Sequence, residues 1–191
     1  MRLPPFLAAA ALAAACASAP PAPERPAAPA GYWPLAVGNT WTWLDESPAL
    51  PTGAKAASRT VRIVERTPDG FFKDSTGAEL RAAPDCIQDR MRRLLCVPFE
   101  VGNRWTSVVS VSSTERYEIA AVGETVSVPA GRFQGCVRVR AHNRAPDGTD
   151  HVLEMTYAPG VGPVRIETFA VVEGKAAPQV RAVLASYQVG R

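Results

Sequence analysis

The sequence predicts an all-β fold, a large curved antiparallel sheet of the half-barrel or sandwich type, with little or no helix after an N-terminal signal peptide. Apolar and polar residues alternate with a period of two in many short stretches from residue 39 onward, as in half-buried strands. Turn residues separate these stretches at intervals of about 8–12 residues, which is typical of sandwiches, barrels and curved sheets. No segment carries a convincing 3.6-residue apolar stripe with caps; residues 83–95 come nearest to one.

The first residues have the features of a secretory signal. One positive charge, Arg2, precedes an apolar run of about ten residues, which is too short to span a bilayer. Two cleavage sites compete. One follows Ala19, where the next residue, Pro20, makes a poor substrate for ordinary signal peptidase, and the other lies directly before Cys16.

The stretch Leu12-Ala13-Ala14-Ala15-Cys16 resembles the bacterial lipobox, in which the cysteine is lipid-modified and becomes the new N-terminus. The resemblance is imperfect, because Ala13 stands where Leu is usual. We predict a lipoprotein signal peptide over residues 1–15 and a lipidated Cys16 that anchors the chain to the cell envelope, since two or three acyl chains make a stable anchor. Ala17, where some bacteria use Asp for inner-membrane retention, implies the outer membrane, facing the periplasm. The alternative is a plain secreted protein that discards Cys16.

Residues 16–30 are Ala- and Pro-rich and predict a semi-rigid tether. Residues 31–191 are long enough for a single domain with a real core, and we expect them to form one antiparallel β domain. The net charge falls from +3 to +2 without Arg2, and the basic residues are dispersed, so nucleic acid is not an expected partner.

The predicted strands follow one another closely along this domain. The turns Thr67–Gly70 and Ala145–Gly148 read Pro-Asp-Gly at their ends, and residues 129–131 and 160–162 are further breaks. The strand candidates are residues 59–66, 104–113, 115–122, 124–131, 133–142, 151–158, 164–172 and 180–189.

Cysteine usage fits an oxidising compartment. With Cys16 lipidated, three cysteines remain, so at most one internal disulfide forms. We favour Cys86 with Cys96, because the residues between them could fold back as a hairpin, but spacing does not exclude a pair with Cys136.

A ten-residue phrase occurs twice, "PLAVGNTWTW" at 34–43 and "PFEVGNRWTS" at 98–107. The Gly-Asn pairs tolerate left-handed backbone and can turn the chain, and the Trp that follows can start a strand and point into the core. We interpret each copy as a turn that begins an aromatic-anchored strand. The alternative is that the tryptophans are ligand-facing and line a binding surface; these are Trp33, Trp41, Trp43 and Trp105.

Four stretches, "YWPLAVGNTWTW" (32–43), "VPFEVGNRW" (97–105), "ETVSVPAGRFQGCVRVR" (124–140) and "YAPGVGPVRIE" (157–167), occur in this order. They resemble a group of bacterial envelope lipoproteins and secreted proteins of uncharacterised function. Its members share Tyr-x-Pro-Leu-x-Val-Gly-Asn-x-Trp, Val-Pro-Ala-Gly-x-Phe and Tyr-Ala-Pro-Gly-Val-Gly motifs, and the resemblance implies no activity. A looser analogy links the predicted fold to the open half-barrel sheets of envelope lipoprotein carriers and receptors.

Residues with catalytic or metal-binding chemistry are sparse. His142 and His151 flank a predicted turn and could approach each other, but a metal site needs a further ligand such as Asp147 or Asp150. Cys136 on a strand is more often structural than nucleophilic. The sequence therefore predicts no catalytic residue, no metal and no cofactor.

The basic run Arg90, Arg92 and Arg93 could meet acidic head groups, or could be a solvated edge that discourages strand pairing. Three functions remain in view. The first is a non-enzymatic binding or scaffolding module for another envelope component. The second is a carrier or chaperone for a lipid or other apolar ligand in a concave sheet, and the third, less favoured, is a hydrolase.

Overall fold

The computed structural model describes residues 26–48, 56–111, 113–145 and 147–190. The predicted signal peptide and Cys16 lie outside these residues. One short 3₁₀ turn and twelve strands follow in order: η1 Pro29–Gly31, β1 Thr40–Asp45, β2 Ser58–Arg66, β3 Phe72–Asp74, β4 Glu79–Ala82, β5 Cys86–Gln88, β6 Arg93–Cys96, β7 Arg104–Ser110, β8 Ser113–Val128, β9 Gly131–Arg144, β10 Asp150–Ala158, β11 Gly162–Val172 and β12 Lys175–Gln188.

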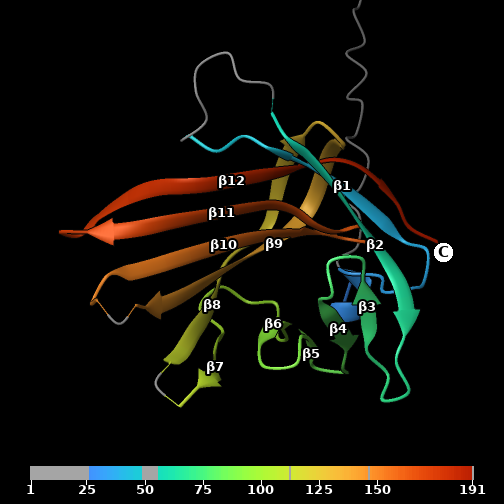
Figure 1. Cartoon of the computed structure of the whole chain (residues 1–191), viewed down its shortest axis with the longest axis horizontal. Helices are drawn as coiled ribbons and strands as arrows, with labels where there is room; N and C mark the ends of the chain where they lie inside the picture. Colours follow the sequence, from blue (N-terminus) through green and yellow to red (C-terminus); the bar gives the residue numbers. More distant parts are fainter. Residues whose placement is uncertain (1–25, 49–55, 112, 146, 191) are drawn as a thin grey trace, which may run out of the picture.

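The strands form one antiparallel, nearly closed, barrel-like sheet in the order β6-β5-β4-β3-β2-β1-β12-β11-β10-β9-β8-β7 (Figure 1). This confirms the predicted all-β fold. In the described part of the chain no helix has the length and apolar character needed to cross a membrane.

The two end strands of the sheet, β6 and β7, meet along a seam that side chains hold together. The Arg93 N–H donates to Ser107 Oγ at 3.0 Å, and the Trp105 indole N–H donates to the Arg93 carbonyl at 2.6 Å. Hydrogen bonds that involve side chains therefore join these two edges. Neighbouring strands elsewhere in the sheet are joined by backbone hydrogen bonds.

The predicted break between residues 122 and 124 is wrong, because β8 runs through it as one strand. Gly123 has φ 80°, and the register with β9 shifts between Val122 and Glu124. The glycine forms a bulge that bends the strand without ending it. The bend lets the β8–β9 hairpin follow the curvature of the sheet.

Residues 83–95, the nearest sequence to a helical pattern, form the short β5–β6 hairpin. Cys86 and Cys96 are cross-strand partners in it, and a disulfide joins them with Cα atoms 4.2 Å apart. Cys136 is a buried free cysteine.

The first copy of the repeated phrase forms a hydrogen-bonded turn before β1. The Asn39 side-chain N–H donates to the Pro34 carbonyl at 2.9 Å. The Gly38 N–H donates to the Ile63 carbonyl, and the Ile63 N–H donates to the Asn39 carbonyl, both at 2.9 Å. Because Ile63 belongs to β2, the turn fixes the start of β1 against its neighbour.

The second copy repeats these bonds before β7. The Asn103 side chain donates to the Pro98 carbonyl at 2.9 Å. Gly102 and Asn103 exchange backbone bonds with Ile119 of β8, again at 2.9 Å. The same ten-residue phrase therefore performs the same structural task twice, which supports the architectural interpretation.

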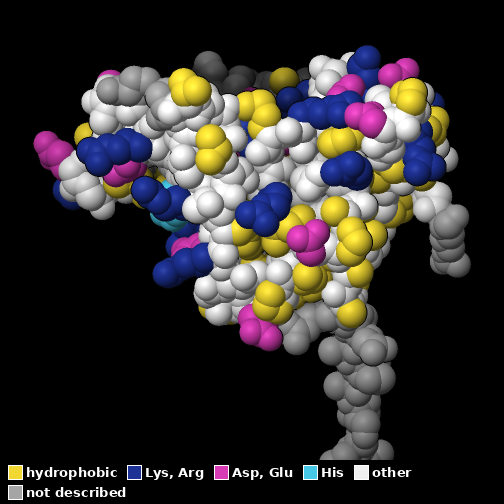
Figure 2. Space-filling model, turned by 90° about the horizontal axis from the view of Figure 1, so that it is seen from below, with side chains coloured by type: hydrophobic (Ala, Val, Ile, Leu, Met, Phe, Trp, Pro, Cys, Tyr) yellow, Lys and Arg dark blue, Asp and Glu magenta, His cyan; other side chains and the backbone are white. Residues whose placement is uncertain are grey.

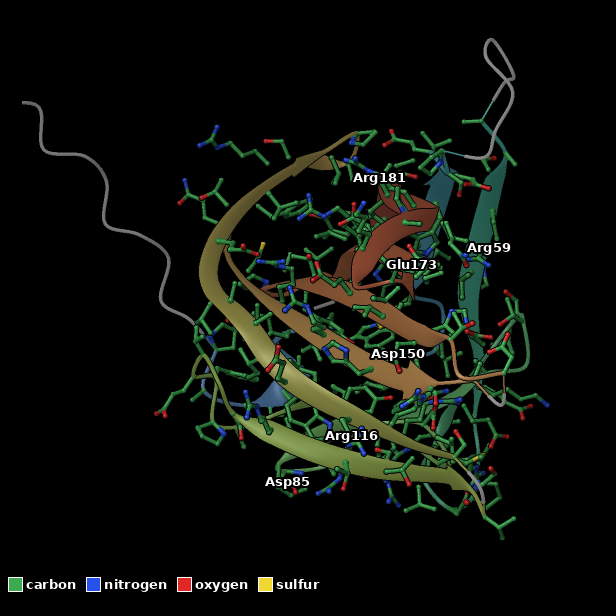
Figure 3. The ribbon with its side chains drawn as sticks, turned by 90° about the vertical axis from the view of Figure 1, so that its left-hand side faces the viewer. Arg59, Asp85, Arg116, Asp150, Glu173 and Arg181 are labelled. Carbon is green, nitrogen blue, oxygen red and sulfur yellow. A yellow bond between two sulfur atoms is a disulfide. The ribbon has the colours of Figure 1, made fainter. Side chains whose placement is uncertain are left out.

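Two hydrophobic clusters fill the inner side of the sheet. Figure 3 shows the long strands curving around the side chains between them. The first centres on β7–β10 and the β5–β6 hairpin, and its large members include Tyr32, Leu95, Trp105, Tyr117, Ile119 and Tyr157. The second centres on β1, β2 and the tip of the β8–β9 hairpin, and includes Trp41, Trp43, Ile63, Val126, Val164 and Leu184.

The last residues of the predicted tether pack on the domain. Pro29 in η1 is fully buried. The Tyr32 hydroxyl donates to the Gly135 carbonyl at 3.0 Å, and the Gly160 N–H donates to the Gly31 carbonyl at 2.7 Å. The chain is therefore held to the sheet from about Pro29 onward.

Gly162, at the start of β11, is the tightest point of the second cluster. Its φ is +111°, and a Cβ there would lie 2.9 Å from Trp33 Cδ1 and 3.2 Å from Trp41 Nε1. The Trp41 indole N–H donates to the adjacent Val161 carbonyl at 2.6 Å, so this ring has little room to retreat.

We predict that Gly162→Ala lowers the free energy of unfolding by about 2–4 kcal/mol, the sum of left-handed backbone strain and overpacking. Gly38→Ala is the matched control, because Gly38 has φ +95° but nothing within 4 Å of the added Cβ. It should cost only the strain, about 1–2 kcal/mol. Urea denaturation of both variants measures the difference, and equal losses would contradict the packing account.

Candidate functional site

The inner face of the sheet changes from apolar to polar toward the end where β8–β12 project. An aromatic and apolar row crosses six strands in register, and its members are Trp105, Tyr117, Ala141, Leu153, Thr168 and Val180. Trp105 and Tyr117 stack with ring centroids 5.5 Å apart. The middle members of this row, from Tyr117 to Thr168, form the floor of a groove.

The next inner-face positions toward the open end are polar. Ser107 lies opposite Glu115, and Asn143 lies opposite His151. The Ser113 hydroxyl and Asn143 Oδ1 are 3.2 Å apart. These groups give the groove a hydrogen-bonding rim above an apolar floor.

Glu115 is the buried charge of this rim. Arg92 Nε donates to Glu115 Oε2 at 2.9 Å, and the Tyr117 hydroxyl donates to the same oxygen in a short hydrogen bond. Burial, and then the bond to Glu115, raise the pKa of Tyr117 well above its ordinary value. The bond to Glu115 likewise raises the pKa of Arg92. The three groups therefore form a fixed Arg–Glu–Tyr network.

The groove has a volume of about 490 Å³ and opens to solvent. It is lined from above by Arg92 and Leu94 and from below by residues of β8–β12, including Leu153, His151 and Gln179. This volume lies within the range of ligand sites, and an apolar floor with a few placed polar groups is typical of them. The geometry suits non-covalent binding.

The outer face carries a ladder of ion pairs. Glu154 accepts from Arg138 at 2.9 Å and from Arg140 at 2.7 Å, while Arg138 also pairs with Glu124 and Arg140 with Glu118. Burial raises the pKa of Glu154, but the hydrogen bonds from the two arginines outweigh it and hold the pKa below its ordinary value.

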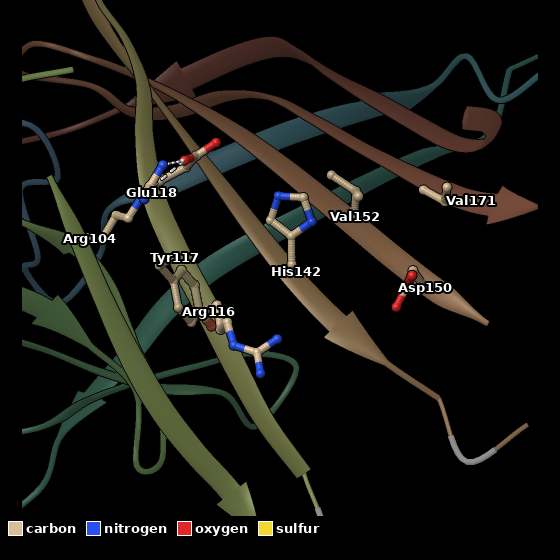
Figure 4. A pocket seen from close by; sticks show the side chains of 8 residues that line it. All are labelled: Arg104, Arg116, Tyr117, Glu118, His142, Asp150, Val152 and Val171. Carbon is tan, nitrogen blue, oxygen red and sulfur yellow. Dashed lines mark hydrogen bonds and ion pairs between the residues drawn. The ribbon is translucent and has the colours of Figure 1, made fainter. Parts of the chain in front are cut away.

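A second hollow, of about 540 Å³, lies on this outer face (Figure 4). Arg104, which pairs with Glu118, stands on one side of it, and His142, Val152 and Asp150 stand on the other. Its two lining arginines and two lining carboxylates balance in formal charge.

The structure places the four tryptophans mainly in the core. Trp41 and Trp105 are 3% and 8% exposed and donate to carbonyls there, and Trp33 packs against Gly162. Trp43 is 6% exposed and lies at the edge of a hollow of about 250 Å³ between β1, β2 and β12. Trp41, Trp43 and Trp105 are therefore mostly buried, while Trp43 and Trp105 each also line a hollow, and a ligand-facing role stays a prediction.

The two histidines do not meet. His142 pairs with Val152 and His151 with Asn143, so they lie one register step apart and point to opposite faces. His142 lines the outer hollow and His151 the inner groove. Among the described residues, no three His, Cys, Asp or Glu side chains lie together as the ligands of a metal ion would.

Cys136 and the basic run Arg90, Arg92 and Arg93 lie in surroundings typical of structural residues. Burial raises the pKa of Cys136 to about 11, which disfavours the nucleophilic thiolate. Arg90 pairs with Asp69 and Glu79, and Arg92 with Glu115 and Asp89, whereas Arg93 donates to the Thr106 carbonyl. The three arginines of this run therefore contact different partners.

Sequence reasoning did not single out Glu115, Tyr117 or their link to Arg92. The alternation in residues 115–119 places Glu115, Tyr117 and Ile119 on one face, which was a usable signal for a carboxylate beside an apolar strand face. The partnership with Arg92 depends on how the β5–β6 hairpin lies across the sheet, which no local pattern reveals.

Comparisons with known proteins give only distant likenesses of shape. No family model matches the chain, and no curated protein matches it. A crystal structure of a proposed exported protein with a YmcC-like fold from Bacteroides fragilis is similar, with 16% identity, 83% of this chain and 99% of that chain covered, and a TM-score of 0.48. A proposed lipoprotein from Parabacteroides distasonis is similar at 12% identity, with 82% and 98% covered and a TM-score of 0.47. These likenesses assign no activity to this chain.

We predict that Tyr117→Phe lowers the free energy of unfolding at neutral pH by about 1.5–3 kcal/mol, because a buried carboxylate loses a hydrogen-bond donor. Tyr187→Phe is the control, since that side chain is 39% exposed and its hydroxyl makes no hydrogen bond within the described residues; it should cost less than about 0.5 kcal/mol. Urea denaturation checks both values.

The same network predicts a pH dependence. The folded-state pKa of Tyr117 is raised, so its contribution is fully present below the unfolded tyrosine pKa of about 10 and is lost as pH rises above it. Between pH 10 and 11.5 the wild type should therefore lose stability more steeply than Tyr117→Phe. If stability falls equally steeply with pH in both chains, folding does not raise the pKa of Tyr117.

Proposed function

We propose that this chain is a lipid-anchored protein of the bacterial cell envelope that acts as a non-enzymatic binding module, and that the inner groove is its binding site. Anchoring follows from the lipobox-like sequence before Cys16 and the Ala/Pro-rich tether. The tether would hold the domain off the membrane, with the outer membrane facing the periplasm as the expected location.

The observation that carries the binding role is the contrast between the filled interior and the open groove. Two clusters of buried side chains occupy the inner side of the sheet, so a carrier with an enclosed apolar chamber is disfavoured. The groove has an apolar floor and a polar rim ordered by the Arg92–Glu115–Tyr117 network. A preordered surface of this kind lowers the entropic cost of binding.

The groove is more suited to a segment of a partner protein than to a lipid. Its rim offers Asn143, His151 and Gln179, which can satisfy the backbone groups of an extended or looped peptide. A lipid tail would leave these polar groups without partners, at a cost in free energy.

The groove is tested by site-specific photocrosslinking in intact cells. A benzophenone amino acid at position 151, on the rim, should give a discrete crosslinked product that disappears when Leu153→Arg is added to fill the floor. The same probe at position 132, on the exposed start of β9, is the control and should not give this product. Thermal unfolding of the Leu153→Arg chain shows whether the substitution itself disrupts the fold.

Two outcomes would contradict the proposal. One is an identical crosslinking pattern from positions 151 and 132. The other is a native mass spectrum of the purified chain that carries a lipid beyond its own anchor, which would favour the carrier.

The anchor is tested separately. Cys16→Ala should abolish incorporation of labelled palmitate and move the chain from the membrane fraction to the soluble periplasmic fraction, because the acylated residue is lost. Ser18→Ala, two residues away, is the control and should leave both properties unchanged. A Cys16→Ala chain that stays with the membrane would show that it is held by something other than this cysteine.

A further inference from the structure

We propose that a third hollow, on the outer face at the seam between β6, β7 and β8, binds a phosphate-type oxyanion through Arg93, Arg104 and Arg116. The hollow has a volume of about 480 Å³ and is lined by these arginines, Thr106, Trp105 and Tyr117. No carboxylate is among its lining residues. Arg104 and Arg116 lie on the face of their strands opposite the inner groove, and both also line the second hollow, where Glu118 and Asp150 are further lining residues.

The sheet register brings the three arginines together. Thr106 and Arg116 are direct cross-strand partners, and Arg104 lies two residues before Thr106 on the same face. Arg93 reaches across the seam, where its Nη2 donates to the Thr106 carbonyl at 3.2 Å. The three arginines, one each from β6, β7 and β8, therefore line one hollow together with Thr106.

The charges of these arginines are poorly compensated. Arg104 pairs with Glu118 at 3.4 Å, but that carboxylate is shared with Arg140. Within the described part of the chain, neither Arg93 nor Arg116 makes an ion pair. Figure 2 shows Lys and Arg side chains over much of the molecule's surface in this view, with Asp and Glu side chains among them.

The neighbouring charges on the outer face of β8–β10 alternate in sign. There Glu154, Glu124 and Glu118 interleave with Arg138 and Arg140, so each charge has a neighbour of opposite sign. Like charges on neighbouring strands repel, and a bound anion would remove that cost. Arg93 and Arg116 lie outside this ladder.

The chemistry of the donors points to a phosphate. Guanidinium groups present pairs of N–H donors that match two oxygens of a phosphate, and they bind it in bidentate fashion. The Thr106 side chain is exposed and can donate a further hydrogen bond. The hollow is open on one side, so a phosphate monoester can enter with its substituent toward solvent.

Binding is measured by calorimetric titration of the full mature chain in uncharged detergent. One arm adds inorganic phosphate, and a second adds phosphatidate within the neutral micelle, which distinguishes a free anion from a lipid head group. Saturable binding in either arm at constant ionic strength is the expected result. Absence of binding in both arms overturns the proposal.

Substitutions locate the site. Arg116→Gln and Arg93→Gln should each weaken binding by about tenfold or more, because each removes a charge-assisted donor pair. Arg132→Gln, the same change of charge at an exposed arginine outside the hollow, should leave the affinity within about twofold of the wild type. Equal weakening by all three variants would show a general effect of surface charge and overturn the proposed site. Unfolding curves show whether each variant remains folded.

Discussion

The Asn side chain that caps each copy of the repeated turn is the constraint on which the rest of the structure depends. Asn39 and Asn103 each hold a proline carbonyl five residues back at 2.9 Å, and their backbones bond to an isoleucine on the next strand. Those isoleucines, Ile63 and Ile119, are each 1% exposed. Each turn therefore sets the register of a strand pair, and the Trp that follows two residues later enters one of the two clusters.

The two turns also determine how the sheet closes. Trp41, after the first turn, donates to the Val161 carbonyl in the β10–β11 connection. Trp105, after the second, donates to the Arg93 carbonyl across the seam. One indole thus ties β1 to the β10–β11 connection, and the other joins the two edges of the sheet. Both bonds link strands that are not neighbours in the sheet order and so help to hold its curvature.

Much of the fold could be predicted from the sequence, because strand alternation and turn chemistry are local properties. The Pro-Asp-Gly turns join β2 to β3 and β9 to β10, where Gly70 and Gly148 have φ 85° and 87°. Gly123 misled the prediction, since a glycine that bends a strand and one that ends it look alike in sequence. The short strands β3 and β4 were missed, because three or four residues are too few to show a period, whereas the β5–β6 hairpin was suggested only by the spacing of Cys86 and Cys96.

The candidate sites could be predicted much less well, because they depend on contacts between distant segments. Arg92 reaches Glu115 over 23 positions, and Tyr157 meets the Leu94 carbonyl over 63. The tryptophans and histidines attracted attention for their chemistry. Trp41 and Trp105 serve the core, and the histidines lie on opposite faces. Strand register decides which carboxylates lie close enough to pair with a given arginine. A single sequence does not reveal that register.

The β7–β8 pair carries both proposed sites, and the strand alternation explains how. In β8, Glu115 and Tyr117 face inward to the groove while Arg116, between them, faces outward to the three-arginine hollow. In β7, Ser107 faces inward and bonds the seam, while Thr106 faces outward between the arginines. Successive side chains of a strand point to opposite faces. A slip of one position would therefore put the basic side chains of β8 where its acidic and aromatic side chains now lie. The bonds of Gly102 and Asn103 to Ile119 prevent that slip, so the repeated turn that builds the fold also keeps the two binding surfaces on their separate faces.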